Sequence, residues 1–170
     1  EDGAPQDQQC SRLRRFTVTK DRDSHGSPEF INGVKMIWKG KFTLGTAETD
    51  INSIASPSVF LRYMQDAANR QMASYGPSYE DLLENGMSFL ISRVTLNIPS
   101  VLYAHDEFEC SSHATPSKGA SFERYCRISK NGETVAESAA VWALVDVKSG
   151  SILRVRDACS DYGAEPYPND

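Results

Sequence analysis

The chain has little of what marks a nucleic-acid-binding or a membrane-spanning protein. Among its 170 residues, 18 are Lys or Arg and 23 are Asp or Glu, which gives a formal net charge of -5. It therefore lacks the basic surface that a phosphate backbone requires. The longest strongly apolar run, Ala139–Val145, is far too short to cross a bilayer, and no leading segment resembles a signal peptide. We expect a soluble protein whose compartment stays open, the cytoplasm first and a plastid if the source is a plant or alga.

Cysteine and histidine are scarce and are not spaced as metal ligands. The four cysteines form no Cys-x-x-Cys pair and lie near no histidine cluster, so we expect neither a metal nor a cofactor. Cys110 and Cys126 flank a predicted hairpin at similar distances from its tip, so they form either a cross-strand disulfide or, by default, two reduced thiols. His25, His105 and His113 have no partner at a recognisable spacing, and we predict that none is catalytic.

The two ends of the chain differ in composition from its middle. Residues 1–33 mix charges with Gly, Pro and Ser and show no sustained period, which predicts a flexible arm. Residues 157–170 have the composition of a tail or linker. Between them, residues 34–156 are the right size for one domain with one core. Because the chain begins with Glu1, it is either a processed form or a piece of something longer.

A long amphipathic helix is predicted over residues 57–75. Ser56 followed by Pro57 favours a helix start, since the hydroxyl can accept from a free backbone N–H and proline has none to leave unpaired. Gly76, in a left-handed conformation, and Pro77 are expected to end it. A stripe of residues recurs at three- and four-residue spacing and should be buried: Phe60, Tyr63, Met64, Ala67, Ala68, Gln71, Met72 and Tyr75.

The remaining segments alternate with a period of two and predict strands. Asn131-Gly132 between two such segments is a strong hairpin signal, and the last strand is apolar on both faces, which favours a central position. A single antiparallel sheet of five or six strands must bury its apolar face against the one long helix. The fold class is therefore α+β, the hotdog arrangement. The predicted strands cover residues 34–45, 87–98, 104–114, 120–129 and 133–147.

Three segments, in order, resemble the N-terminal hotdog unit of acyl-acyl-carrier-protein (acyl-ACP) thioesterases. They are "LRYMQDAANRQMASYG", "SFLISRVTLNIP" and "VAESAAVWALVDVKSG", and the resemblance covers Lys39 to Arg156. It implies a thioesterase that hydrolyses acyl thioesters of acyl carrier protein or coenzyme A and releases a fatty or polyketide acid. It also implies a homodimer or higher homo-oligomer, because an uncovered sheet edge invites pairing with a second copy.

The resemblance breaks down at one motif. Family members usually carry two fused units, with an Asp-x-Asn-x-His motif in the second. This chain has Asp50-Ile51-Asn52-Ser53-Ile54 in its first-unit loop, so Ile54 stands where the histidine would be. By resemblance, single-unit relatives place an acid either in this loop, where Asp50 lies, or within the helix, near Asp66. Some polyketide-releasing members dispense with the acid.

Thioester hydrolysis needs a base or nucleophile and donors for the developing oxyanion. The free N–H groups of residues 58–60 at the helix start can supply the donors. Asp50 can attack or deprotonate water, and Asn52 can orient that water or the thioester; Gln65 and Asp66 are secondary candidates. Alternatively, Asp50 and Asn52 are turn residues that satisfy backbone groups, Asp66 and Gln65 have purely structural roles, and the chain is a non-catalytic module for acyl binding or subunit pairing.

Overall fold

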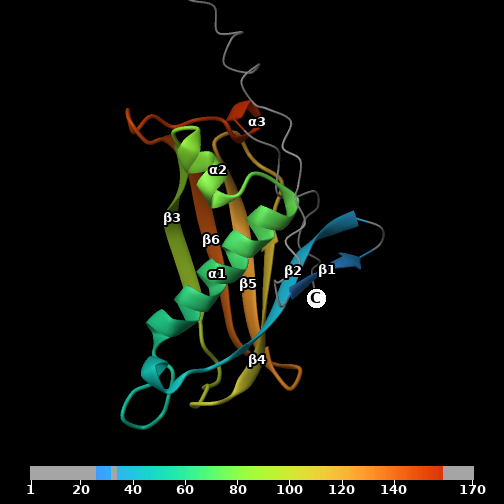
Figure 1. The fold of residues 1–170 in the computed structure, drawn as a ribbon, viewed down its shortest axis with the longest axis vertical. Coiled ribbons are helices and arrows are strands. Elements are labelled where there is room, and N and C mark those ends of the chain that lie inside the picture. The colour runs from blue at the N-terminus through green and yellow to red at the C-terminus, as the bar shows by residue number, and fades with distance from the viewer. Residues whose placement is uncertain (1–25, 32–33, 159–170) are drawn as a thin grey trace, which may run out of the picture.

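The structure is a computed structural model, and it describes residues 26–31 and 34–158. One six-stranded sheet, antiparallel throughout, has the strand order β1-β2-β4-β5-β6-β3. Helix α1 (Pro57–Tyr75) lies across one face of this sheet (Figure 1), which confirms the hotdog arrangement. The strands are β1 (Gly26–Ile31), β2 (Val34–Thr43), β3 (Met87–Asn97), β4 (Glu107–Ala114), β5 (Ser121–Lys130) and β6 (Glu133–Asp146). The short helices are η3 (Thr46–Glu48), α2 (Tyr79–Glu84) and α3 (Val155–Ala158).

Strand β1 lies within the predicted arm of residues 1–33. Its backbone pairs with β2, from Gly26 opposite Gly40 to Ile31 opposite Val34. The expectation that the fold begins after residue 33 was therefore wrong for this strand, because a short segment containing Gly, Ser and Pro shows no alternation for a sequence pattern to detect. The rest of the arm, and residues 159–170 of the predicted tail, lie outside the described residues.

Helix α1 has the predicted bounds and begins with Pro57 as predicted, but the predicted cap at Ser56 and the left-handed Gly76 are wrong. The Ser56 hydroxyl pairs with the Ser58 hydroxyl at 2.8 Å and caps no backbone N–H. At the other end Gly76 is extended, with φ of -162°, and is not left-handed; its N–H donates to the Met72 carbonyl oxygen at 2.9 Å. Pro77 and the new cap at Ser78, which accepts from Asp81 N–H, redirect the chain into α2.

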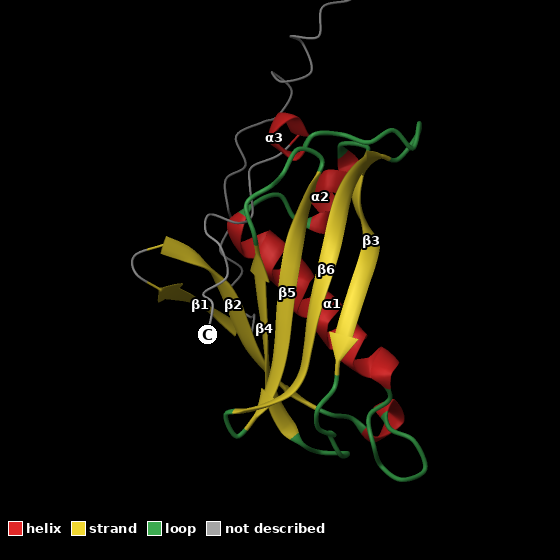
Figure 2. Ribbon diagram, turned by 180° about the vertical axis from the view of Figure 1, so that it is seen from behind, coloured by secondary structure: helices red, strands yellow, loops and turns green. Residues whose placement is uncertain are grey.

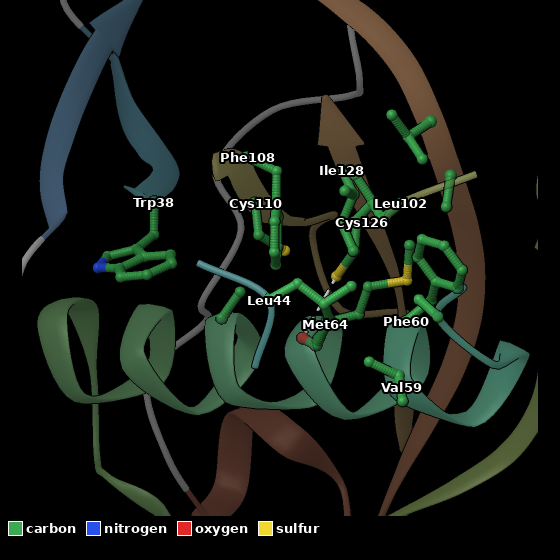
Figure 3. Close-up of a cluster of buried hydrophobic side chains, with 14 residues drawn as sticks. Trp38, Leu44, Val59, Phe60, Met64, Leu102, Phe108, Cys110, Cys126 and Ile128 are labelled. Carbon is green, nitrogen blue, oxygen red and sulfur yellow. Dashed lines mark hydrogen bonds between the residues drawn. The ribbon is translucent and has the colours of Figure 1, made fainter. Parts of the chain in front are cut away.

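The buried stripe of α1 forms the core with the concave face of the sheet. Figure 3 shows Phe60 and Met64 of the helix facing Phe108, Cys110 and other strand side chains. Trp38 on β2 is 1% exposed, and its indole lies over Gly40 so closely that a Cβ there would come within 2.2 Å of the ring. A glycine inside this strand is therefore explained by close packing of its neighbour.

The core also contains an arginine that the sequence pattern did not mark. Arg124 on β5 is 1% exposed and donates to Gln71 of α1 and, at 2.8 Å, to Ser112 of β4. Its guanidinium lies 4.9 Å from the ring centroid of Trp142, a cation–π distance. The hydrogen bond from Arg124 accounts for the fully buried Gln71 in the stripe of α1, since a buried amide needs a partner.

Cys110 and Cys126 are free thiols, so the disulfide alternative is wrong. The register places Cys110 opposite Ile128 and Cys126 opposite Ser112, so the two cysteines are offset along adjacent strands. Instead, the Cys110 thiol donates to the Tyr63 carbonyl oxygen (3.8 Å) and the Cys126 thiol donates to the Met64 carbonyl oxygen (3.7 Å), both on α1. Burial raises the pKa of both thiols, which makes them unreactive core residues.

The other face of the sheet and one of its edges are less covered. Figure 2, seen from behind, shows α1 on the far side of the sheet, with β5 and β6 toward the viewer. On edge strand β3, Ile91 pairs with Trp142 and Val94 with Ala140. Trp142 and Ala140 are buried on the helix side of the sheet, and paired residues share a face, so Ile91 and Val94 lie on that side too. Helix α1 packs mainly on β4, β2 and β5, so Ile91 and Val94 stay 47% and 43% exposed. We call this surface, Ile91 and Val94 beside α1, the β3 flank.

Among the helices of residues 26–31 and 34–158, none is long and apolar enough to span a membrane.

Candidate active site

The loop that joins β2 to α1, residues 44–56, is held on one side by the β3–β4 connection. At its start, Leu44 N–H donates to the Asp106 carbonyl oxygen and His105 N–H donates to that of Leu44. At its end, Ala55 N–H donates to the Leu102 carbonyl oxygen at 2.9 Å. This entrance loop is therefore an ordered turn whose two ends are fixed next to the start of α1.

Asp50 shapes the tip of the entrance loop. Its Oδ1 accepts from the N–H groups of Asn52 (2.8 Å) and Ile54 (3.0 Å), and its backbone bonds to Ile54 and Ser53. The turn-residue interpretation of Asp50 is thus confirmed as far as Oδ1 is concerned. Within the described part of the chain no residue bonds to Oδ2, and Asp50 is exposed. The carboxylate is therefore oriented through one oxygen while the other faces outward.

Asn52 lies at the exposed end of the same turn. It contacts Asp50 through its backbone N–H, so the two predicted loop residues are adjacent, although the amide side chain does not take part in that bond. Between them Ile51 is 100% exposed. Ser53 adopts a φ of 61° to close the turn, a conformation that short polar residues tolerate better than branched ones.

The start of α1 keeps a backbone donor available. Pro57 has no N–H, and Val59 N–H donates to the Ser56 carbonyl oxygen at 3.0 Å. The Ser56 side chain does not cap the helix, and no described residue accepts from Ser58 N–H. A free N–H at the positive end of a 19-residue helix favours a negatively charged oxygen.

Gln65 and Asp66 lie on different sides of α1. Asp66 Oδ2 accepts from Arg70 Nε at 2.9 Å, and the Arg70 guanidinium lies 5.9 Å from the ring centroids of Trp38 and Phe42. Asp66 is therefore on the side of the helix that faces β2. Gln65, the preceding residue, points about 100° away around the helix, and its Nε2 donates to Asn69 Oδ1 at 3.2 Å. The two secondary candidates therefore have different partners and point in different directions from α1.

Glu48, a residue that was not among our candidates, is the most heavily bonded carboxylate of the entrance loop. Its Oε2 accepts from the Tyr63 hydroxyl (2.6 Å) and from Gly45 N–H (2.8 Å), and its Oε1 pairs with Arg62. Burial opposes its charge, but these bonds outweigh that effect and lower the pKa of the Glu48 carboxyl. The Tyr63 spacing of 15 residues has no sequence signature, so only the fold reveals this contact.

Other places in the described structure do not compete with the entrance loop. No group of three or more His, Cys, Asp or Glu side chains there is arranged to hold a metal ion. His113 is buried on β4, His105 is an exposed loop residue, and His25 lies outside the described residues. A cavity of about 300 Å³ lies over β3, β5 and β6, and none of our candidates lines it: Thr95, Asn97, Tyr125, Cys126, Arg127, Glu137, Ser138 and Ala139 do.

Solved structures with the same fold include several thioesterases. An acyl-ACP thioesterase from Bacteroides thetaiotaomicron superposes with a TM-score of 0.68 at 16% identity, covering 79% of this chain and 56% of that chain. A DHNA-CoA thioesterase from Staphylococcus aureus gives 0.66 at 12% identity, over 70% and 80% of the two chains. A 1,4-dihydroxy-2-naphthoyl-CoA thioesterase from Synechocystis gives 0.64 at 12% identity, over 70% and 89%.

These identities show a common fold and nothing finer. The chain spans 56% of the length of the Bacteroides protein. Among curated protein sequences no relative matches. A family profile, that of the acyl-ACP thioesterase N-terminal domain, matches residues 35–162. Since that match covers most of the 170 residues, the chain belongs to the acyl-ACP thioesterase family and corresponds to its N-terminal domain.

Proposed function

We propose that this chain hydrolyses acyl thioesters of acyl carrier protein or coenzyme A and so releases a fatty or polyketide acid. The observation that carries the proposal is the Asp50 carboxylate, which is oriented through Oδ1 and leaves Oδ2 unbonded by any described residue. A carboxylate held in this way can work as a general base or a nucleophile without reorganising. Family membership supports acyl thioesters as the substrate class.

In the proposed reaction, Asp50 removes a proton from a water molecule as the water oxygen adds to the thioester carbonyl carbon. The carbonyl oxygen becomes negative and accepts from the unpaired Ser58 N–H at the helix start. When the intermediate collapses, the carbon–sulfur bond breaks and the thiolate takes up the proton from Asp50. Asn52, adjacent on the loop, is proposed to orient the water or the thioester.

The acyl chain is proposed to lie along the β3 flank. Ile91 and Val94 offer half-exposed apolar surface on the helix side of the sheet, and burying such surface stabilises an aliphatic ligand. We infer that Gln65, which points about 100° away from Asp66 around the helix, faces this flank and is the better of the two helix candidates, whereas Asp66 is paired with Arg70 beside β2. Asp66 stays a candidate only if substrate binds beside β2.

Self-association through β3 is part of the proposal. As an edge strand, β3 has one side without a neighbouring strand in the described sheet, and it exposes Leu90 as well as Val94. Unpaired backbone beside apolar side chains favours pairing with an identical strand. Such a homodimer would cover the β3 flank and enclose the acyl chain.

A second candidate function is a non-catalytic acyl-binding or subunit-pairing module. Two observations favour it: Ile54 occupies the position of the motif histidine, and the chain spans 56% of the length of the Bacteroides thioesterase. In that case the chemistry would belong to another unit, and Asp50 would have only its role in the turn.

Turnover of a panel of acyl-ACP and acyl-CoA thioesters by the purified chain separates the two functions. We expect Asp50→Asn to lower kcat by about 100-fold or more, in the range of a lost general base. Asp146→Asn is a matched control, because Asp146 Oδ1 accepts from the N–H groups of Lys148 (3.0 Å) and Ser149 (2.7 Å) in a similar turn. Equal activity of the two variants would leave Asp50 as a turn residue, and no hydrolysis by the unaltered chain would favour the module.

A further inference from the structure

Glu48 joins the entrance loop to the second turn of α1. Its carboxylate has three donors from two elements: the Tyr63 hydroxyl and Arg62 guanidinium from α1, and Gly45 N–H from the loop itself. The Glu48 side chain is 20% exposed. Both of its oxygens therefore accept at least one bond, and Oε2 accepts two.

The bond to Tyr63 is the strong member of the set. At 2.6 Å it has the length of a charge-assisted O–H···O⁻ bond. The Tyr63 ring is fixed by edge contacts with Phe42 (5.1 Å between centroids) and Phe108 (4.9 Å), so its hydroxyl has a defined place. Arg62 is 61% exposed, and an ion pair so open to solvent contributes little.

The position of Glu48 is transmitted to Asp50 through a short path. Thr49 pairs with Ala55 in an isolated antiparallel bridge, which closes the base of the turn that carries Asp50. Glu48 is the residue immediately before this bridge. A displacement of Glu48 would therefore move the bridge and with it the Asp50 carboxylate, while the start of α1 would stay anchored in the core by Phe60.

We propose that Glu48 is a positioning residue, which through Tyr63 and Gly45 holds the base of the entrance loop so that Asp50 keeps its place relative to the start of α1. This inference rests on the proposed function, in which Asp50 acts on a thioester bound at that helix start.

Three variants of the full chain test the inference: Glu48→Gln, Tyr63→Phe and the double variant. Glutamine keeps the size of the side chain but removes the charge, and phenylalanine keeps the ring in the Phe42–Phe108 cluster while removing the hydroxyl. We expect each single variant to lower kcat by about 10- to 100-fold, the loss that a misplacement of about 1 Å can cause, with KM within about twofold. The double variant should be no slower than the slower single one, since both changes act on the same bond: Glu48→Gln replaces its charged acceptor by a neutral amide oxygen and Tyr63→Phe removes its donor.

The control variant is Glu133→Gln, which makes the same charge change at an exposed residue next to the β5–β6 turn. If the unaltered chain hydrolyses thioesters and Glu48→Gln has the same kcat as Glu133→Gln, the inference is overturned and the proposed function is left intact. Strictly additive losses, or a rise in KM in place of a fall in kcat, would also overturn it. Absence of hydrolysis by the unaltered chain would overturn the proposed function and this inference together.

Ultraviolet titration of tyrosine gives a readout independent of activity. Burial and the hydrogen bond to Glu48 raise the pKa of Tyr63, and Tyr63→Phe identifies its signal among the seven tyrosines. We expect Glu48→Gln to shift this ionisation to lower pH and Glu133→Gln to leave it in place. An unshifted titration in Glu48→Gln would show that Glu48 does not hold Tyr63, and would overturn the inference.

Discussion

The two sides of α1 differ in what covers them. Toward β2, the rings of Phe42, Tyr63 and Phe108 pack on one another, and Phe108 is 3% exposed. Toward β3, Ile91 and Val94 also lie on the helix side of the sheet, yet they are 47% and 43% exposed. One side is completed as a core by this chain alone, whereas the other leaves apolar surface exposed, which we propose an acyl chain or a second copy covers.

The largest expected effect is a difference in stability loss between a truncation on the β2 side of α1 and one on the β3 side. Phe108→Ala should lower the free energy of unfolding by about 3–5 kcal/mol, the usual cost of removing a buried aromatic ring. Val94→Ala should cost less than about 1 kcal/mol, because much of that side chain is already in water. Urea denaturation at low protein concentration measures both. Similar costs would mean that the β3 side is core after all.

A charge on the β3 flank should act on association. Val94→Lys is expected to raise the dissociation constant for self-association by at least about tenfold, because pairing would remove an unpaired ammonium group from water. Leu83→Lys, a similar change at an exposed leucine of α2, is the control. Light scattering over a dilution series reads the outcome, and a chain that is monomeric at tens of micromolar would exclude pairing through β3 for this chain alone.

The comparison also ranks the two helix candidates. We expect Gln65→Ala to lower kcat/KM by about tenfold, equal to roughly one good hydrogen bond, because we infer that Gln65 faces the β3 flank, where the acyl chain is proposed to lie. Asp66→Ala should change kcat/KM by less than about twofold, since Asp66 is paired with Arg70 beside β2. Steady-state kinetics on one acyl thioester decide the ranking. The reverse order would place the substrate on the β2 side.

The smallest effect expected is a change in acid stability at Glu48. Because its pKa is lowered in the folded state, its stabilising contribution is fully present above the unfolded value of about 4.3 and is lost as pH falls through the folded pKa. Glu48→Gln should therefore flatten the acid limb of the stability curve, and Glu133→Gln should not. Thermal unfolding between about pH 3 and pH 6 measures the difference, and parallel curves would argue against the bond to Tyr63.

Several elements could be predicted from local pattern because their causes are local. The stripe from Phe60 to Met72 has a helical period, and Asn131-Gly132 supplies the two positive φ angles, 54° and 84°, that a tight hairpin turn needs. Pro57 and Pro77 bracket the helix whatever the rest of the chain does. Strand β1 escaped prediction because its partner strand, and not its own pattern, gives it an extended conformation.

For the site, the sequence by itself determined that a carboxylate and an amide precede a long helix, since Asp50 and Asn52 lie in the short segment before Ser56-Pro57. Only the tertiary structure decided which neighbours act on them. The Glu48 carboxylate on the entrance loop accepts from the Tyr63 hydroxyl on α1, and Asp66 pairs with Arg70 on the β2 side of that helix. The physical reason is that helix capping and periodicity depend on residues a few positions apart, whereas the direction of a side chain toward β2 or β3 depends on how the helix is laid on the sheet.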